Sequence, residues 1–342
     1  MMRYVEIQGA KLSVIGLGTW QFGSRDWGYG ADYANTTARD ITVRALDLGI
    51  NLFDTAEIYG FGRSERILGE ALATAERSGA AIGRRDEAFI ATKITPVLPL
   101  APIVEQRAKA SVKRLRTNRI DLYQVHAPNP FVPDGPTMAG MRRLVDTGLV
   151  RFVGVSNYSL SRWRSAERAL GGVVFSNQVS FSLVDRRPLT DLVPFARSEG
   201  RVVIAYSPLA QGLLGGRYDA EHRPSGLARR FNPVFLPDAL ERATALIEAL
   251  REIGRTHQCA PAQVALAWVL SHGNVVAIPG ASSVAQVESN AAAADVELSE
   301  SEVTQLTQAA ERFEVPGRAA AVRAAAEDFV GSLRERYSRT VT

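Results

Sequence analysis

The sequence predicts an α/β protein folded as one (β/α)8 TIM barrel, with an N-terminal β-hairpin as a plug and extra helices at the C-terminus. Short apolar runs rich in β-branched residues alternate with longer amphipathic stretches along most of the 342 residues. Runs such as FIAT and VVIAY are apolar on both faces, as parallel strands covered by helices must be. Eight such units in series favour a closed barrel over an open sheet.

The elements are expected in the following order. A hairpin over Tyr4–Ser13, turning at Gln8 and Gly9, comes first and can plug the bottom of the barrel. The strands are expected at Ile15–Gly18, Asn51–Asp54, Ala88–Lys93, Ile120–His126, Val150–Ser156, Phe175–Val179, Val202–Tyr206 and Val275–Ile278. The helices are expected at Thr37–Leu48, Ser64–Arg77, Val104–Leu115, Thr137–Thr147, Ser161–Leu170, Asp191–Ser198, Ala260–His272 and Ser283–Ala294.

Residues typical of helix ends support these boundaries. Ser64 precedes a helical pattern, and Pro261 can occupy a first turn. Glycines 148, 171 and 200 stand just past expected helix ends.

Two additions interrupt the regular alternation. The stretch from Pro208 to about Pro237 is rich in Gly, Pro and Arg and is expected to act as a lid or clamp, followed by an extra helix over Asp238–Gln258. Further helices are expected at Ser299–Phe313 and Arg318–Arg336. No shift in composition marks a second domain, so one domain is expected over 1–342, with a core at about 14–311 and an extension at 312–342.

The composition narrows the class of protein. A net charge of +4, from basic residues mixed with acidic ones along the chain, argues against nucleic-acid binding. The single cysteine, Cys259, excludes an intramolecular disulfide and suits a reducing compartment. With no signal-peptide pattern and no apolar run of membrane length, we expect a cytoplasmic protein that acts on a small molecule without membrane attachment. The oligomeric state stays open.

Several familiar motifs fail. Gly16 and Gly18 follow a strand, but Gln21 stands where a dinucleotide fingerprint needs its third glycine. No Gly-Lys pair exists for a phosphate loop, and Ser156 lacks the closing glycine of a nucleophile elbow. The histidines show no metal-ligand spacing, so no metal is expected: His126, His222, His257 and His272.

Four polar residues end or follow successive apolar runs. Asp54 and Lys93 end the second and third expected strands, Tyr59 follows the second, and His126 ends the fourth. In a barrel, the carboxyl ends of the strands form the functional face. A carboxylate and an ammonium buried there are costly unless they pair, so we expect Asp54 to pair with Lys93.

These residue types suit proton donation to a carbonyl. A tyrosine has an ordinary pKa of about 10, and an ammonium beside Tyr59 favours the phenolate and is expected to lower that pKa. Such a phenol can protonate a carbonyl oxygen while a hydride reaches the carbon. His126 can donate a hydrogen bond to the same oxygen. The sequence therefore predicts Asp54, Tyr59, Lys93 and His126 as a catalytic tetrad.

The motifs around the tetrad resemble those of the aldo-keto reductase superfamily, in its bacterial, NADP(H)-dependent form. They are FDTAEIYG (53–60), ATK (91–93), DLYQVH (121–126), GVSN (154–157), NQ (177–178), YSPL (206–209) and IPGA (278–281). The resemblance extends over roughly Val14 to Glu311, with every motif in order. It implies a (β/α)8 barrel, in agreement with the count of elements, and the reduction of an aldehyde or ketone by hydride transfer from NADPH.

The resemblance also assigns residue roles. It implies that Tyr59 is the general acid, that Asp54 holds Lys93, and that His126 orients the carbonyl. Ser156, Asn157 and Gln178 match residues that bind the nicotinamide carboxamide, and Tyr206 matches the aromatic residue stacked on that ring. The loop with Ser207, Leu209, Gln211 and Leu213 matches the loop beside the pyrophosphate, and Gly280 to Ser283, with Gln286 and Asn290, match the adenosine end. The full set that the resemblance implies for cofactor binding is Thr19, Trp20, Asp54, Ser156, Asn157, Gln178, Tyr206, Ser207, Leu209, Gln211, Leu213, Arg217, Ile278, Gly280, Ser282, Gln286 and Asn290.

One segment departs from the family pattern. Many members carry a lysine or arginine within or just after the stretch equivalent to Gly280–Gln286, where it binds a 2′-phosphate, but this stretch reads GASSVAQ and holds no cation. Charge-assisted hydrogen bonds are about twice as strong as neutral ones. Arg217 or an arginine of 223–230 can compensate, so NADPH is expected as the preferred cofactor and NADH as the alternative.

Large aromatic residues near the ends of the first and fourth strands predict an apolar substrate pocket. With the two catalytic side chains, its expected lining is Trp20, Phe22, Trp27, Tyr59, His126 and Phe131. An aromatic aldehyde, a ketone or a small dicarbonyl fits such a pocket, and a sugar or polyketide carbonyl stays open.

Two other readings of the barrel remain. One is a cofactor-sensing regulatory subunit that binds a protein partner, as channel β-subunits resembling this barrel do. The other is a barrel isomerase or hydrolase using Asp54 and His126, which would leave Asn157, Gln178 and Tyr206 without a purpose.

Overall fold

The computed structural model describes residues 1–23, 36–77, 87–224 and 232–313. Its strands are β1 (Tyr4–Ile7), β2 (Ala10–Ser13), β3 (Leu17–Gly18), β4 (Leu52–Asp54), β5 (Phe89–Ile94), β6 (Ile120–Val125), β7 (Val150–Ser156), β8 (Ser176–Ser180), β9 (Val202–Tyr206) and β10 (Val275–Ala277). Each expected strand is therefore present, with ends that differ by two residues or fewer.

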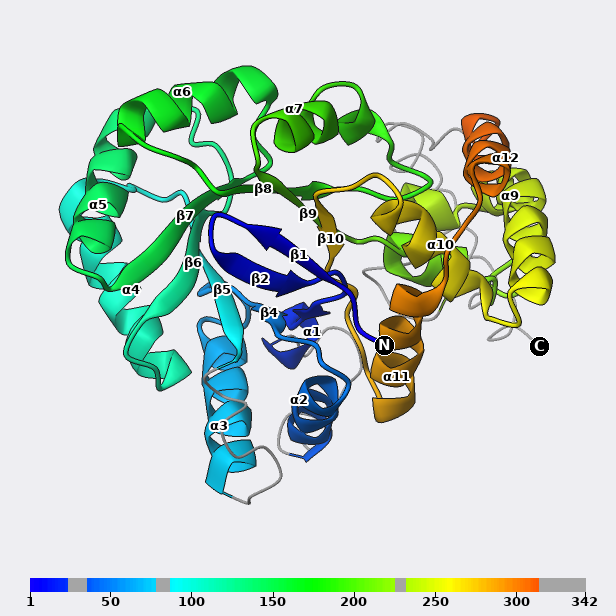
Figure 1. Cartoon of the computed structure of the whole chain (residues 1–342), viewed down its shortest axis with the longest axis horizontal. Coiled ribbons are helices and arrows are strands. Elements are labelled where there is room, and N and C mark those ends of the chain that lie inside the picture. The colour runs from blue at the N-terminus through cyan, green and yellow to red at the C-terminus, as the bar shows by residue number, and fades with distance from the viewer. Residues whose placement is uncertain (24–35, 78–86, 225–231, 314–342) are drawn as a thin grey trace, which may run out of the picture.

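The helices surround these strands (Figure 1). The α-helices are α1 (Trp20–Gly23), α2 (Ala38–Asp47), α3 (Arg63–Arg77), α4 (Ala101–Leu115), α5 (Asp134–Asp146), α6 (Leu160–Leu170), α7 (Leu192–Ser198), α9 (Pro237–Thr256), α10 (Pro261–Leu270), α11 (Val284–Ala292) and α12 (Glu300–Glu311). Four 3-10 helices, η2 (Arg187–Leu189), η3 (Ala210–Gly215), η4 (Pro233–Phe235) and η5 (Ala293–Asp295), complete the described elements. The helix expected at Arg318–Arg336 lies outside the described residues.

Strands β3 to β10 form one parallel sheet in sequence order. The first and last strands meet through parallel bridges from Ile15 to Ala277 and from Gly18 to Gly280. The backbone N–H of Gly16 donates to the Ala277 carbonyl at 2.7 Å, which closes the ring. The predicted (β/α)8 barrel is confirmed, and its carboxyl strand ends share one rim.

The hairpin β1–β2 plugs the opposite end, as expected. Its two strands pair antiparallel. Its turn is held at the amino-terminal ends of two barrel strands. Gln8 donates to the carbonyl of Gly200, just before β9, at 3.0 Å, and Arg151, at the start of β7, donates to the Gly9 carbonyl at 2.7 Å. In Figure 1 it lies across the middle of the barrel. Leu12 of the hairpin is fully buried in the cluster that fills the barrel interior, so the hairpin closes this end of the barrel. The reacting groups must therefore lie at the opposite end, where the strands have their carboxyl ends.

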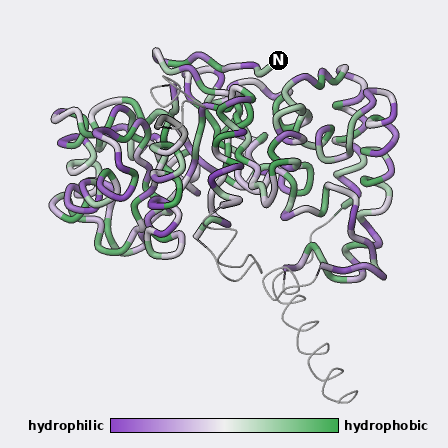
Figure 2. Tube along the Cα trace, turned by 90° about the horizontal axis from the view of Figure 1, so that it is seen from below, coloured by the Kyte–Doolittle hydropathy of each residue, from purple (hydrophilic) through white to green (hydrophobic). Residues whose placement is uncertain are grey.

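Aromatic side chains fill the barrel below that face. The rings of Phe89, Phe152 and Phe175 stack with centroids 4.5 to 6.3 Å apart. A larger apolar cluster lies between the strands and the helices. Apolar and hydrophilic residues alternate along the helices in Figure 2, as expected when one side of each helix packs on the barrel.

Two helices begin earlier than expected by more than one residue. Helices α4 and α5 start three residues before the expected Val104 and Thr137. Each carries a proline in its first turn, Pro102 or Pro136. A first-turn proline costs no helical hydrogen bond, because its missing N–H would have had no partner there. The expectation wrongly placed each helix start after its proline.

Ser64 is not a helix cap, in contrast to the expectation. It lies within α3, and its hydroxyl bonds Thr19 and Thr55 instead of a backbone N–H of the helix.

Among the described residues, no helix combines the length and apolar character that crossing a bilayer requires.

Candidate active site

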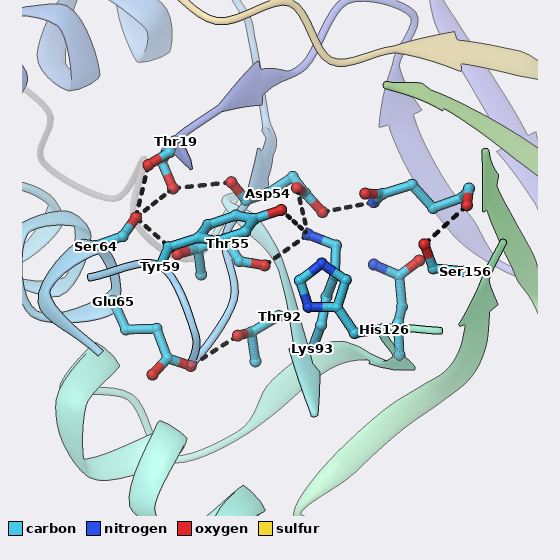
Figure 3. Close-up of polar contacts among 12 residues, drawn as sticks. Thr19, Asp54, Thr55, Tyr59, Ser64, Glu65, Thr92, Lys93, His126 and Ser156 are labelled. Carbon is cyan, nitrogen blue, oxygen red and sulfur yellow. Dashed lines mark hydrogen bonds and ion pairs between the residues drawn. The ribbon is translucent and has the colours of Figure 1, made fainter. Parts of the chain in front are cut away.

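The tetrad lies at the carboxyl rim of β4, β5 and β6. Asp54 is the last residue of β4, and Lys93 is the fifth residue of β5. Tyr59 lies in the turn between β4 and α3, and His126 directly follows β6. The parallel register aligns these strand ends, so four residues far apart in sequence meet on one face (Figure 3).

Lys93 is the centre of this group. Its side chain is fully buried, and its ammonium donates to Asp54 Oδ1 at 2.6 Å, to the Thr55 carbonyl at 2.8 Å and to the Tyr59 hydroxyl at 3.3 Å. An ammonium has three N–H donors, and each has an acceptor here. The predicted pair of Asp54 and Lys93 is thus present, and Lys93 touches the expected proton donor.

The pKa of Tyr59 does not move as expected. Burial raises it and Asp54 adds to the rise, while the charge and hydrogen bond of Lys93 lower it; the net pKa lies above the ordinary value of 10.0. Lys93 therefore acts in the predicted direction, but the removal of water around the phenol outweighs it. The expectation of a net lowering is wrong for this structure.

His126 is held neutral. Burial and the nearby charge of Lys93 lower its pKa from 6.5 to about 3. Its ring meets the Tyr59 ring edge-on, with centroids 5.6 Å apart. A neutral imidazole has one N–H to donate and does not carry a charge that would repel Lys93. Its position beside the phenol suits a hydrogen bond to a carbonyl oxygen.

A second polar chain joins the tetrad to the residues expected to bind nicotinamide. Gln178 Nε2 donates to Asp54 Oδ2 at 2.7 Å, and Ser156 Oγ donates to the Gln178 carbonyl at 2.9 Å. Asn157 Nδ2 lies 3.1 Å from Ser156 Oγ, and the Tyr206 hydroxyl donates to Asn157 Oδ1 at 2.9 Å. Ser156 ends β7, Asn157 follows it, and Gln178 and Tyr206 lie on β8 and β9, so hydrogen bonds join the four residues at the carboxyl rim.

The loop after β9 carries the residues expected beside a pyrophosphate. Gln211 has a positive φ of 57° and a buried Oε1 with no hydrogen-bond partner among the described residues. Rotating the amide by 180° would present NH2 donors, which suit a phosphate. A cavity of about 580 Å³ opens here, lined among others by Asp185, Arg187, Tyr206 and Ser207.

Other residues of this loop differ in accessibility. Leu213 is fully buried, so its side chain does not reach a ligand and only its backbone can lie beside one. Leu209 is half-buried and packs on the outer core. Arg217 is exposed, with its guanidinium over the Tyr218 ring at 6.0 Å. Arg223 is directed toward Phe235, because its Nε donates to the Phe235 carbonyl at 3.0 Å.

The segment expected at the adenosine end is folded on itself. The backbone N–H and the hydroxyl of Ser282 both donate to Gln286 Oε1, at 2.7 and 2.9 Å. Asn290 Nδ2 donates to the Gly280 carbonyl at 3.3 Å, and Ile278 is buried. Gln21, which the expected set omitted, donates to the Ala281 carbonyl at 2.9 Å and secures the segment to α1. Gln21 and Ala281 are 260 residues apart in the sequence, so no local pattern indicated this contact.

Burial limits what the side chains of two residues of the expected site can contact. Thr19 is fully buried, and its hydroxyl is used within the protein on the Asp54 carbonyl and Ser64. Phe22 is also fully buried in the outer core and does not line a substrate pocket. Thr19 lies between β3 and α1, and Phe22 lies within α1.

Two further aromatic residues of the expected pocket are accessible. Trp20 is 47% exposed, and its ring centroid lies 6.5 Å from that of Tyr59. Phe131, on the loop after β6, is 91% exposed. Trp27 lies outside the described residues.

Within the described ranges, no group of three or more His, Cys, Asp and Glu residues could hold a metal ion.

A sequence model of the aldo/keto reductase family matches residues 14–311, most of the chain. The chain belongs to this family. It is 56% identical over 313 residues to an uncharacterised oxidoreductase of Mycobacterium tuberculosis, covering 91% of this chain and 94% of that protein. It is 30% identical over 322 residues to the NADH-specific methylglyoxal reductase of Escherichia coli, covering 89% and 96%.

The fold has solved counterparts in the aldo/keto reductase family. A Klebsiella pneumoniae aldo/keto reductase, crystallised with NADP and acetate, is 27% identical with a TM-score of 0.72, covering 92% of this chain and 97% of that one. As a member of this family, the chain is an NAD(P)H-dependent oxidoreductase that acts on small carbonyl compounds. Family membership leaves no support for a barrel isomerase or hydrolase.

Proposed function

We propose that this reductase converts an aldehyde or ketone to the alcohol, with Tyr59 as the general acid. The observation that carries the proposal is the fully buried Lys93, whose ammonium bridges the Asp54 carboxylate and the Tyr59 hydroxyl. Breaking a buried pair of this kind costs about 3–5 kcal/mol, so the arrangement is not incidental to the fold.

The chemistry divides between cofactor and protein. The nicotinamide cofactor supplies a hydride to the carbonyl carbon. Tyr59 donates its phenolic proton to the carbonyl oxygen as negative charge develops there. Lys93 stabilises the phenolate that remains, through its 3.3 Å contact and its charge. Asp54 keeps Lys93 in place and retains its own second contact to Gln178.

His126 completes the site as a neutral donor. With a pKa of about 3 it stays uncharged across the physiological range, so it cannot compete with Tyr59 as an acid. Its N–H would orient the carbonyl oxygen toward the phenol and support charge on that oxygen.

The nicotinamide would be held by Ser156, Asn157 and Gln178, with Tyr206 beneath its ring. These residues fit the group, because their amide and hydroxyl groups converge next to Asp54 and Lys93. Gln178 Oε1 accepts no hydrogen bond from the described residues, so it can accept one from a carboxamide NH2.

We propose NADPH as the preferred cofactor, with Arg217 as the cation for its 2′-phosphate. Arg217 is exposed and follows the loop that carries Gln211. NADH is the second candidate, since Ser282 and Gln286 close the 280–286 segment without a positive charge, and a relative is named as NADH-specific.

The substrate is proposed to be an aromatic or small apolar carbonyl compound. Trp20 presents exposed aromatic surface beside Tyr59, and Phe131 is exposed on the loop that follows His126. A methylglyoxal reductase among the relatives makes a small dicarbonyl a second substrate to test. We further propose one domain over 1–342 acting in the cytoplasm, where the single thiol Cys259 stays reduced.

A turnover assay tests the function. Purified protein is mixed with NADPH or NADH and with 4-nitrobenzaldehyde or methylglyoxal, and cofactor oxidation is followed by absorbance. We expect turnover with at least one pair and a higher kcat/KM with NADPH. Tight cofactor binding without turnover would favour the alternative of a cofactor-sensing regulatory subunit. None of the relatives named above supports that alternative. Absent cofactor binding would contradict the proposal.

A further inference from the structure

The loop that carries Tyr59 is closed at its base by Ser64. This loop runs from Thr55, just after β4, to the first turn of α3. The backbone N–H of Ser64 donates to the Tyr59 carbonyl at 3.2 Å, and its hydroxyl lies 2.9 Å from Thr55 Oγ1. Ser64 and Thr55 are fully buried, so water does not compete for these contacts.

Three hydroxyls form one chain through this point (Figure 3). Ser64 Oγ lies 2.8 Å from Thr19 Oγ1, and Thr19 Oγ1 donates to the Asp54 carbonyl at 2.9 Å. Each hydroxyl has one proton. The order Thr55 to Ser64 to Thr19 to the Asp54 carbonyl uses the three protons in three contacts. Ser64 can alternatively donate to the Thr19 carbonyl at 2.8 Å, and in both cases it links the loop to β3 and β4.

We infer that Ser64 is a positioning residue for the proton donor, an inference that rests on the proposed role of Tyr59. The Ser64 hydroxyl contacts neither the Tyr59 hydroxyl nor Lys93, because its partners are Thr19 and Thr55. Its hydroxyl joins the loop that holds the phenol to the strand end that holds Asp54. It thereby sets the distance between the Tyr59 hydroxyl and Lys93.

The contact that depends on this distance is the longest one that Lys93 makes. Its ammonium lies 3.3 Å from the Tyr59 hydroxyl, against 2.6 Å and 2.8 Å to its two other acceptors. A shift of about 1 Å would break it, and misplacement of that size can cost about a hundredfold in rate. The loop also packs closely against the end of α1, where a Cβ on Gly60 would lie 2.3 Å from the Gly23 carbonyl oxygen.

The next residue fixes α3 to the adjacent strand. Glu65 is fully buried and accepts from the Thr92 hydroxyl at 2.7 Å and from Arg114. Thr92 precedes Lys93 on β5. The start of α3 is thus tied to β5 by Glu65, and the first half of the Tyr59 loop is tied to β5 by the Glu57 N–H, which donates to the Lys93 carbonyl at 3.3 Å. Among the described residues, the Ser64 hydroxyl links the other end of the loop to Thr19, directly after β3. Loss of the Ser64 hydroxyl should therefore loosen the loop while α3 stays docked.

The experiment compares Ser64→Ala with Ser13→Ala. Ser13 is equally buried and accepts from the backbone N–H groups of Asn51 and Leu52, at the opposite end of β4. Both variants lose a buried hydroxyl and should lose thermal stability. We expect kcat to fall by about tenfold or more in Ser64→Ala, with cofactor Kd unchanged, and to stay within about twofold in Ser13→Ala.

A double-mutant cycle separates positioning from general loosening. On a Tyr59→Phe background, measured by single turnover, Ser64→Ala should have an additional effect of less than about twofold, since the hydroxyl that it positions is gone. An equal loss on both backgrounds, or an unchanged kcat in Ser64→Ala, would overturn the inference. If Tyr59→Phe itself keeps full activity, the proposed acid fails instead.

A second variant covers the case in which Ser64→Ala does not fold. Thr55→Val removes one hydroxyl of the same chain and keeps the Thr55 carbonyl that accepts from Lys93. Its kcat should fall in the same direction, by about threefold or more, with cofactor Kd unchanged. A kcat equal to that of the unmodified protein would contradict the inference.

Discussion

At the scale of single residues, the site is organised around one buried ammonium. Removing a charge from water costs several kcal/mol, and at Lys93 the Asp54 carboxylate offsets that cost. Burial acts to lower the pKa of Lys93, but the contacts with Asp54 and Tyr59 outweigh it and raise the pKa above its ordinary value. Lys93 therefore stays charged and available to a phenolate throughout the physiological range.

Lys93→Met should destabilise the fold as well as the reaction. The variant leaves the Asp54 carboxylate buried without its cation, so the free energy of unfolding should fall by about 3–5 kcal/mol. Adding Asp54→Asn should recover part of this loss, because the uncompensated charge is then removed. Urea denaturation of the single and double variants measures both effects. A double variant no more stable than Lys93→Met would contradict the pairing.

His126 should make the protein acid-sensitive. Its pKa is about 3 in the folded protein, against 6.5 as the ordinary value. As pH falls from about 6.5 toward 3, the unfolded chain binds a proton that the folded one does not, and stability is lost at up to about 1.4 kcal/mol per pH unit. His272, with a pKa of about 4, acts with the same sign.

The variant His126→Asn should remove its share of this slope. Urea denaturation between about pH 6 and pH 4 would show a shallower loss of stability in the variant than in the unmodified protein. Parallel curves would show that His126 is not held neutral by the fold.

The positions of the tetrad could be read from the sequence, but their electrostatics could not. Polar residues at the ends of apolar runs mark the carboxyl rim of a parallel barrel, which placed Asp54, Lys93 and His126. The sign of the Tyr59 pKa shift depends on how much water the fold removes from the phenol. That quantity follows from packing around the loop after β4, which no local pattern records.

At the scale of elements, the loop between β4 and α3 determines where the phenol lies. Gly60 within it has a φ of +57°, and a Cβ there would lie 2.3 Å from the Gly23 carbonyl oxygen. Only glycine combines that conformation with so close an approach of two backbones.

Gly60→Ala should therefore act on catalysis, in contrast to a matched glycine. Gly200 has a φ of +60° but nothing within 4 Å of an added Cβ, so Gly200→Ala carries only the conformational cost of about 1–2 kcal/mol. Gly60→Ala adds a clash that shifts Tyr59, and kcat should fall by about tenfold or more. Steady-state kinetics and thermal melts of both variants check this. Equal kcat values would contradict the role of the close approach.

Element boundaries show where local patterns mislead. The expected starts of α4 and α5 lie after Pro102 and Pro136, yet both prolines lie within first turns. Ser64 had the residue type of a cap but uses its hydroxyl on Thr19 and Thr55, directly after β3 and β4. Tertiary contacts decided these cases, and α1 was too short for a periodic pattern to reveal.

At the scale of the whole molecule, the proposed cofactor site extends along much of the carboxyl rim. Ser156 and Gln178 lie next to the tetrad, while Ser282 lies between β10 and α11 and Gln286 lies in the first turn of α11. The family motifs predicted this arc from the sequence. They could not show that the 280–286 segment is closed by its own hydrogen bonds.

Arg217→Gln should change the choice of cofactor. If this exposed guanidinium contacts a 2′-phosphate, its loss should raise the Kd of NADPH by about tenfold and that of NADH by less than about twofold. Fluorescence titration of both cofactors measures the two constants. An equal change for both would assign Arg217 to a group that the cofactors share and would contradict the proposed role.

The central claim is that Tyr59 donates the proton, and Tyr59→Phe tests it most directly. The variant retains the ring but has no hydroxyl beside Lys93. Aldehyde reduction and cofactor Kd are measured on the same preparation. We predict a kcat lower by about 10² to 10⁴-fold, with cofactor Kd unchanged. A variant that binds cofactor normally and keeps the kcat of the unmodified protein would contradict the claim.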